Sequence, residues 1–403
     1  MPELLGYLLV PLLTGLIGWS TNWVGVRIML YPAEFKGIWY IGWQGIIPRL
    51  RVRLTRGLVQ HSIAEVCTPA DMLQAVDDAD AIFEISRLIY PDMEDWLDEL
   101  LSKQYGAYWN LAPTLVRRQV FAMMRKQVPD FAESLLEEIR KRADEFINIE
   151  DIAAAEAERR PDVLTKVLLG MAQQEMRFII RSGLYIGIPL GCIQAVAWYL
   201  YPNSLVLPLF GLLVGAFTNW LALKILMHPS RPVRFMGFTF QGLFIARQQE
   251  VAVDFTRIFT ENFLTIRQVI QFVWNGERKD EVRKMVKRQF RRTAEKKFFT
   301  ASLYRLLKIR GDIDEMAGEA IDGAEDRLLP HLERDDISTR LLSPVNGLLT
   351  RRISELSPQR YQQLLLPLVK QDEWIVVTVG AVLGFFAGTA QLVFLFGGSL
   401  MGG

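Results

Sequence analysis

The sequence predicts an all-α integral membrane protein with four transmembrane helices in a tandem parallel repeat and two cytoplasmic helical bundle domains. Three observations predict this class: uncharged stretches long enough to cross a bilayer, motifs that recur at a fixed separation, and helical spacing of apolar residues between them. Half of the 403 residues are hydrophobic and 23% are charged. The chain is therefore too apolar for an ordinary soluble protein and too charged for a protein that lies almost wholly in the bilayer.

Three uncharged stretches exceed the roughly 20 apolar residues that a transmembrane helix needs. They cover residues 4–26, 182–223 and 374–403. The second is long enough for two crossings, and the Tyr-Pro-Asn-Ser sequence at 201–204 is typical of a tight turn between helices. We therefore expect helices over roughly 4–30, 182–201, 205–228 and 374–397. Because its charges follow the first stretch rather than precede it, we expect a membrane helix there and not a signal peptide.

Basic residues gather at one end of each of the first three expected helices. They are Arg27, Lys36, Arg49, Arg51, Arg53 and Arg56 after the first helix, Arg177 and Arg181 before the second, and Lys224, Arg231, Arg234 and Arg247 after the third. Positively charged loops close to membrane helices remain in the cytoplasm. We therefore expect both chain termini outside and both large connections, about 31–180 and 229–372, in the cytoplasm.

Motifs of the first half recur in the second half 197 residues later. Thr21-Asn22-Trp23 recurs as Thr218-Asn219-Trp220, Gln44-Gly45 as Gln241-Gly242, and Gly183, Gly187, Gly191 and Gln194 as Gly380, Gly384, Gly388 and Gln391. Chance does not hold one register over so many glycines and amides. The sequence therefore predicts two halves that cross the membrane in the same sense, related by a pseudo-two-fold axis along the membrane normal.

These motifs resemble those of the DUF445 family of bacterial membrane proteins, which is related to the UPF0754 membrane proteins. The resemblance covers both halves and includes Pro32, the 44–49 sequence Gln-Gly-Ile-Ile-Pro-Arg, and the glycine-stepped helices that end in Gln194 and Gln391. It implies a multi-pass protein of the bacterial inner (cytoplasmic) membrane and no particular activity. The second half departs at 241–246, which lacks the Pro-Arg pair, so any role of that element is expected in the first half only.

The soluble segments show helical periodicity. Phe131, Leu135, Ile139 and Phe146 form an apolar stripe at helical spacing, and few runs alternate strictly, so we expect almost no sheet. The expected order along the chain is transmembrane helix 1 (1–30), a basic aromatic interfacial segment (31–56), cytoplasmic helical domain 1 (57–181), a hairpin of transmembrane helices 2 and 3 (182–228), an interfacial segment with cytoplasmic helical domain 2 (229–372), and transmembrane helix 4 (373–403).

Four amides are expected inside the membrane: Asn22, Asn219, Gln194 and Gln391. A buried amide in a bilayer is unfavourable unless it is hydrogen-bonded. One interpretation places the two asparagines together near the pseudo-two-fold axis, where they line a polar path. The interpretation that we favour makes them contacts between helices, each bond contributing roughly 0.6–2 kcal/mol.

Six glycines step along two of the expected helices at intervals of four residues: Gly183, Gly187, Gly191, Gly380, Gly384 and Gly388. This spacing puts small residues on one face and allows backbones to approach closely. We expect the two glycine-stepped helices to pack against each other or against the face with Gly211 and Gly215, and the glutamines one turn beyond to close the contact by hydrogen bonding.

Basic residues at the inner membrane surface are candidate lipid contacts. Arg27 and Lys224 are expected to extend their charged ends to the headgroups, with a specific lipid-phosphate contact as the alternative. The segment 31–56 combines Trp39, Tyr40 and Trp43 with the four basic residues Arg49, Arg51, Arg53 and Arg56. It is typical of an interfacial segment attracted to anionic lipid, or else of charge that only sets the topology.

The most basic run of the chain is 283–292. Steps of four align its charges on one side of a helix, a pattern that could meet nucleic acid or acidic lipid. Acidic residues that could instead pair with it are abundant nearby and in the first domain, among them Glu94, Asp98, Glu99 and Glu319. Because the net charge is only +1, we expect internal pairing or a solvated face, and no nucleic acid partner.

The sequence shows no catalytic motif, and the three histidines, His61, His228 and His331, lie far apart. We therefore expect no enzyme, no metal and no cofactor. The function expected is a non-enzymatic scaffold or organiser that engages anionic membrane lipids or an unidentified protein partner through its cytoplasmic domains. The alternative is a channel or transporter with a polar path near the asparagines; with four helices per chain, it would require a homo-oligomer.

Overall fold

The computed structural model describes residues 2–39, 41–201, 203, 205–235, 237–293, 313–322, 327, 335–370 and 373–400. Over these residues the chain is helical apart from two small β-hairpins. Four helices are long and apolar enough to cross a membrane, which agrees with the predicted all-α membrane protein. They are α1 (Pro2–Leu30), α11 (Val163–Leu200), α12 (Val206–Met227) and α22 (Glu373–Leu400).

The chain folds into two compact units, and each unit contains segments from both halves of the sequence. Unit 1 comprises Met1–Val66, Ala153–Phe259 and Thr350–Gly403, and unit 2 comprises Cys67–Ile152 and Thr260–Leu349. This corrects the prediction of one separate bundle in each of 57–181 and 229–372. The helices of one half cannot cover their own apolar faces, so Phe146 of the first half packs against Val282 and Met285 of the second.

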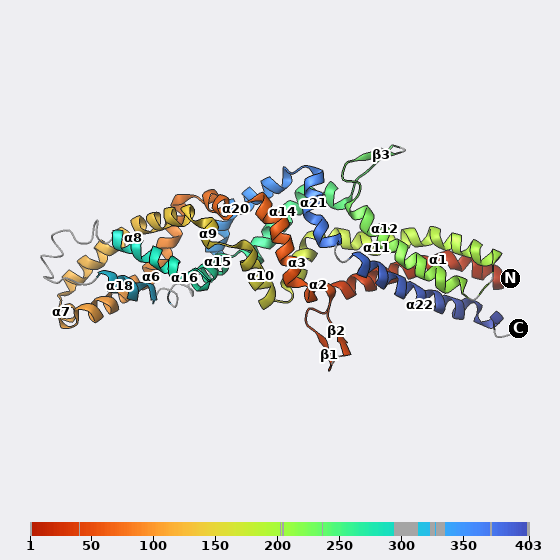
Figure 1. Ribbon diagram of the computed structural model, residues 1–403, viewed down its shortest axis with the longest axis horizontal. Helices are drawn as coiled ribbons and strands as arrows, with labels where there is room; N and C mark the ends of the chain where they lie inside the picture. The colour runs from red at the N-terminus through yellow and green to blue at the C-terminus, as the bar shows by residue number, and fades with distance from the viewer. Residues whose placement is uncertain are drawn as a thin grey trace. The chain divides into compact units, whose positions relative to one another are not determined.

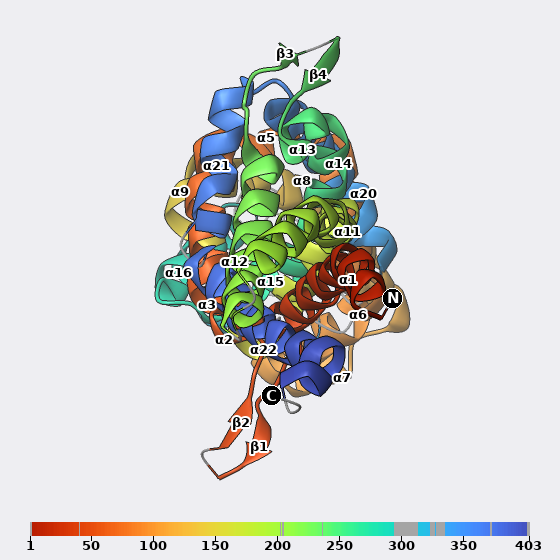
Figure 2. The same cartoon turned by 90° about the vertical axis from the view of Figure 1, so that its right-hand side faces the viewer.

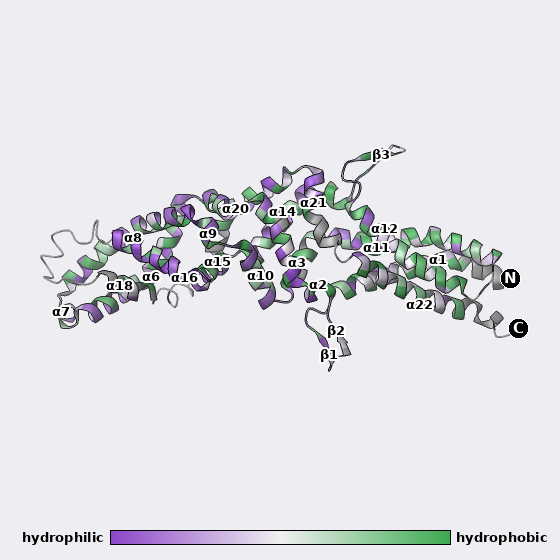
Figure 3. Cartoon of the chain, in the orientation of Figure 1, coloured by the Kyte–Doolittle hydropathy of each residue, from purple (hydrophilic) through white to green (hydrophobic). Residues whose placement is uncertain are grey.

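In unit 1 the four apolar helices lie side by side, and the beginning of α1 and the end of α22 lie at the same end of this group (Figures 1 and 2). The hydropathy colouring is green along most of their length (Figure 3). The predicted boundaries hold within a few residues except for α11, which begins at Val163 rather than near 182. The residues before 182 carry charges but continue the helix, with a non-helical break at Ala172 (φ −116°, ψ 18°).

The remaining helices of unit 1 lie at the opposite end of the four-helix group (Figure 1). They pack on one another through contacts such as that between α3 and α21. They are α2 (Ile46–Arg49), α3 (Arg51–Leu58), the π-helix η1 (Val59–Ile63), α4 (Ala64–Val66), α10 (Ile149–Arg159), α13 (Leu243–Ala246), α14 (Gln248–Phe263) and α21 (Pro358–Lys370), of which α10 and α14 extend across a unit boundary.

Two hairpins interrupt the helical structure, one after α1 and one after α12. Strands β1 (Lys36–Ile38) and β2 (Ile41–Trp43) pair antiparallel, with Lys36 opposite Trp43. Strands β3 (Val233–Phe235) and β4 (Phe238–Phe240) pair likewise, with Val233 opposite Phe240. The expected interfacial segment is therefore part hairpin and part short helix. Strands of three residues are too short to give an alternating pattern in the sequence.

Unit 2 is built on two long antiparallel helices, α6 and α8, which pack along each other. Its other helices cover them from both parts of the sequence. The helices of unit 2 are α5 (Pro69–Ala75), α6 (Asp78–Tyr105), α7 (Ala107–Asn110), α8 (Thr114–Lys141), α9 (Ala143–Phe146), α15 (Ile266–Asn275), α16 (Lys279–Thr293), α18 (Ile313–Asp322) and most of α20 (Asp335–Ser354).

The ends of the α6–α8 pair are fixed by polar contacts. At one end, Trp109 is buried against Leu101 and Val120, and its indole N–H donates to Asp98 Oδ1 at 2.8 Å. At the other end, the Arg140 guanidinium donates to the carbonyl oxygens of Leu73 and Val76. These contacts join α8 to α5 and to the residues just before α6, and α7 to α6.

Candidate functional site

The two intramembrane asparagines do not meet. Asn22 Nδ2 donates to the carbonyl oxygen of Ile179 at 2.7 Å, and Asn219 Nδ2 donates to that of Val376 at 2.8 Å. Each bond joins two helices of the same half, and each spans 157 residues. The structure therefore places both amides in contacts between helices, as the favoured interpretation of the sequence expects, and not together beside a polar path.

The glutamines are the amides that meet. Gln194 is fully buried, and its Nε2 donates to Gln391 Oε1 at 3.3 Å. The Thr14 hydroxyl lies 2.7 Å from Gln194 Oε1. Close by, Val10, Trp198 and Leu207 form a buried apolar cluster with Leu392, so that all four membrane helices contact one another at this level.

The glycines give the helices their close contacts. A Cβ on Gly183 would meet the backbone of Gly18, and one on Gly384 would meet the backbone of Gly211. The glycine-stepped helices α11 and α22 therefore pack on α1 and α12 respectively, and their stepped faces do not pack against each other. The expected contact with Gly211 and Gly215 is present for α22. The helix-packing role of the six predicted glycines follows from these backbone contacts.

The cations that end α1 and α12 lie against aromatic rings. The Arg27 guanidinium carbon is 5.6 Å from the centre of the Trp23 ring and 6.0 Å from that of Tyr31. The Lys224 ammonium nitrogen is 6.0 Å from the centre of the Trp220 ring. Both cations are exposed. This arrangement is typical of the headgroup region, where aromatic rings and snorkelling cations gather.

The four arginines of the interfacial segment have different environments. Arg51 donates to the carbonyl oxygens of Ala157 at 2.7 Å and Pro48 at 3.0 Å, so it contributes to packing rather than to a lipid surface. Arg49, Arg53 and Arg56 are exposed. Lipid contact by the four arginines stays a prediction.

The basic run 283–292 lies on α16. This helix buries Val282 and Met285 and exposes Lys284 and Arg288. Several acidic residues expected to pair with the run have other partners: Glu319 with Lys103, Glu99 with Arg327, Glu94 with Arg125, and Asp98 with Arg117. Other acidic residues near the run, at 312, 325 and 326, lie outside the described residues. Of the six basic side chains in this run, four are exposed, and that of Arg283 lies against the Trp274 ring.

Unit 1 contains a buried ion pair that the sequence does not reveal. Glu175 is almost completely buried, and its Oε1 accepts from Arg247 Nη1 at 2.5 Å. Arg247 also pairs with the exposed Glu250. The buried hydroxyl of Tyr361 has no hydrogen-bond partner. Burial, and secondarily the charge of Glu175, raise the pKa of Tyr361 well above its usual value of 10.0.

Among the described residues, the hollow with the most apolar lining is a cavity in unit 2. Its volume is about 490 Å³, within the range of roughly 300–1,000 Å³ that is usual for ligand pockets. It lies between α6 and α8 and is closed by side chains of α5, α15, α16, α18 and α20. Among its described lining residues none is charged, and only Gln127, Gln271 and Thr293 carry an amide or hydroxyl group.

A cavity of this size and polarity strongly favours an apolar occupant. Water would not fill the cavity well, because a buried water needs two to four polar partners, and an apolar cavity tends to stay dry.

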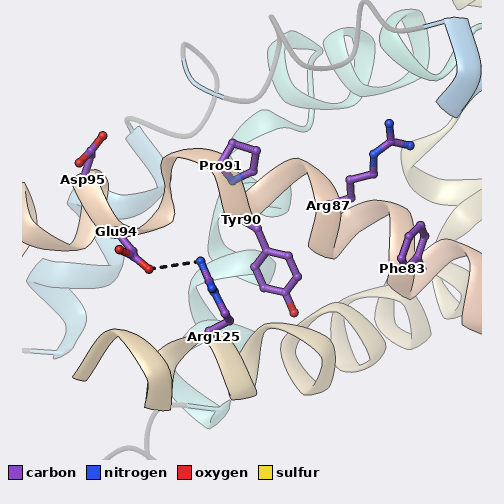
Figure 4. A pocket seen from close by; sticks show the side chains of 7 residues that line it. All are labelled: Phe83, Arg87, Tyr90, Pro91, Glu94, Asp95 and Arg125. Carbon is purple, nitrogen blue, oxygen red and sulfur yellow. Dashed lines mark hydrogen bonds and ion pairs between the residues drawn. The ribbon is translucent and has the colours of Figure 1, made fainter. Parts of the chain in front are cut away.

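A second hollow in unit 2, of about 600 Å³, lies at the surface beside Pro91 of α6. Figure 4 shows Arg125 of α8 pointing towards Tyr90 and Glu94 of α6. Arg125 Nη2 is 3.2 Å from Glu94 Oε1, and its guanidinium carbon is 5.6 Å from the centre of the Tyr90 ring. The charges here satisfy each other at the surface, so this hollow links α6 with α8 and has no group poised for chemistry.

Among the described residues, no group of three or more histidine, cysteine, aspartate or glutamate side chains could hold a metal ion. The side chain of His61 and all of His331 lie outside the described residues. A scan against protein-family models found no match, and no similar protein was found among curated proteins or solved structures.

The glycine contacts predict a position-specific effect within α1. Gly18→Ala should lower the free energy of unfolding by about 1–3 kcal/mol, because the new Cβ would press on the backbone of Gly183. Gly25→Ala in the same helix is the matched control, since nothing lies within 4 Å of its added Cβ. Unfolding of the purified protein by titration with SDS measures both. Equal losses in the two variants would contradict the packing described here.

The buried Tyr361 predicts a loss of stability in alkali. A raised pKa in the folded state means that this stability is complete below the unfolded pKa of 10.0 and is lost as the pH rises above it. Tyr361→Phe should cost little at neutral pH, because the hydroxyl has no partner, and should reduce the fall in melting temperature between pH 8 and about pH 11. Tyr108→Phe, at an exposed position, is the control and should leave that fall unchanged.

Proposed function

We propose that this chain is a non-enzymatic scaffold of the bacterial inner membrane that engages anionic lipid or protein partners on the cytoplasmic side. The observation that carries the proposal is the pair of hairpins at the ends of α1 and α12, each of which presents apolar side chains beside basic ones.

The hairpins have the composition of interfacial anchors. Trp39 at the first turn is 89% exposed, and Phe35 and Trp43 are about half exposed beside Lys36. In the second hairpin, Val233 and Phe240 are about half exposed beside Arg234. Both hairpins project sideways from the helices of unit 1 (Figures 1 and 2). Aromatic rings beside basic residues favour the headgroup layer, where one side is apolar and the other is wet.

The basic residues around the first hairpin favour its binding to an anionic membrane surface. A hollow of about 720 Å³ at its base is lined by Arg27, Lys36, Tyr31 and Trp43, together with two acidic side chains. The exposed arginines at 49, 53 and 56 follow directly. Each basic side chain close to an anionic membrane surface contributes about 1 kcal/mol. We therefore propose that the first half is the main lipid-binding half, since the second lacks the Pro-Arg pair.

Equivalent contacts in the two halves support a parallel repeat. The two asparagine bonds each span 157 residues, and the two glutamines that meet are 197 residues apart, as are the first residues of the two hairpins. Gln194 and Gln391 occupy the same position in the two halves. Two such residues meet if they lie close to a pseudo-two-fold axis that relates the halves. On this view the axis runs along the membrane normal, the chain termini are outside and the soluble helices are cytoplasmic.

The same contacts bear on the alternative, an oligomeric channel. A path beside Asn22 and Asn219 would need their amides to face water. Both are instead buried and donate to backbone carbonyls of neighbouring helices. This favours the scaffold.

Lipid composition tests the proposal. The triple variant Arg49→Gln, Arg53→Gln and Arg56→Gln should weaken retention of phosphatidylglycerol by on the order of a hundredfold, since three charges of about 1 kcal/mol each are lost. Native mass spectrometry of protein from nanodiscs of mixed phosphatidylglycerol and phosphatidylcholine would count the lipids retained.

The matched control removes three charges elsewhere: Lys284→Gln, Arg288→Gln and Arg292→Gln on the exposed side of α16. It should leave the retained phosphatidylglycerol unchanged. The proposal fails if the two triple variants behave alike, or if the unaltered protein shows no preference for phosphatidylglycerol over phosphatidylcholine.

A further inference from the structure

We infer that the cavity of unit 2 binds a single acyl chain, whose carboxyl or ester end lies at the indole N–H of Trp274. This goes beyond the scaffold function and does not depend on it, because the cavity and the hairpins belong to different units. Three properties of the cavity carry the inference: its length, the chemistry of its lining and one unsatisfied polar group.

The cavity is long and narrow. It contacts α6 from Ala81 to Leu100 and the antiparallel α8 from Met124 to Ile139. At 1.5 Å per residue, these stretches are about 28 Å and 22 Å long. A volume of 490 Å³ over such a length gives a mean cross-section of roughly 20 Å². An extended hydrocarbon chain fits such a space.

The lining selects hydrocarbon. Leucine, isoleucine, valine, methionine and aromatic side chains provide nearly all of it, and the few amide and hydroxyl groups are scattered. A sugar, a nucleotide or a charged peptide would lose its hydration without gaining partners, which is strongly unfavourable. An acyl chain loses only contacts with water and gains dispersion contacts along its whole length.

One end of the cavity carries a polar group suited to the head of such a ligand. Trp274 lines the cavity, packs in the same apolar cluster as Ile139, and its buried Nε1 has no hydrogen-bond partner. The guanidinium carbon of Arg283 lies 5.9 Å from the centre of the Trp274 ring. A carboxylate or ester carbonyl at this end would accept from the indole N–H and lie near a positive charge. Buried donors are rarely left unsatisfied in folded proteins.

Binding of palmitate to the delipidated full-length protein tests the inference. We expect saturable binding of one palmitate per chain by native mass spectrometry, together with a rise in melting temperature that grows with palmitate concentration. Hexadecane, which has the chain but no head, should bind more weakly. One phospholipid per chain in protein purified with its own lipids, displaced by palmitate, would also support the site and would identify the membrane as the source of the chain.

Variants locate the site. Leu136→Trp should fill the cavity and reduce palmitate affinity at least tenfold, whereas Leu115→Trp, on the exposed side of the same helix, should not. Because it fills empty space, Leu136→Trp should also raise the melting temperature without ligand. Trp274→Phe removes the donor and keeps an aromatic ring, and it should reduce the affinity for palmitate by about three- to tenfold while leaving that for hexadecane unchanged.

If Leu136→Trp does not fold, Val345→Phe on α20 fills the cavity from another side. The inference is overturned if palmitate binding is not saturable, or if Leu115→Trp weakens it as much as the cavity variants do. Equal affinity of the unaltered protein and Trp274→Phe for palmitate would overturn the placement of the head.

Discussion

The structure depends on the absence of water around its membrane helices. In a bilayer, every polar group must find its partner inside the protein. Here the glycines of α11 and α22 bring backbones close enough for the side chain of one helix to reach the carbonyl of the next. The bond from Asn22 to Ile179 and its equivalent from Asn219 to Val376 depend on this approach. A larger residue at Gly183 or Gly380 would separate the backbones and leave an amide unsatisfied in hydrocarbon.

The architecture of unit 1 follows from this contact. The pair of α1 and α11 contacts the pair of α12 and α22 through Gln194 and Gln391 and through the apolar cluster around Trp198. Because the four helices form one closed group, the long connections emerge together at one end of it. There they form the short helices of unit 1 and its two hairpins. The buried pair of Glu175 and Arg247 links α11 to this set of helices.

The features that could be predicted from the sequence are those that depend on a local pattern of residues. Long uncharged stretches gave four membrane helices, and amides at fixed positions were expected to join helices. The hairpins were missed because strands of three residues leave no periodic signal. The two units were missed because the partner of Phe146 lies more than a hundred residues away, at Val282 and Met285. The cavity could not be predicted, since its volume depends on how closely distant side chains pack.

The two halves meet within one chain at Gln194 and Gln391. Cross-linking of Gln194→Cys with Gln391→Cys by a short bismaleimide reagent, in native membranes and on a background with Cys67→Ser and Cys192→Ser, tests this contact. We expect a cross-link within the monomer, detected as a linked peptide after proteolysis, and none for Gln194→Cys paired with Val382→Cys, which lies on an exposed part of α22. If cross-links form only between chains, the two halves do not meet in this way.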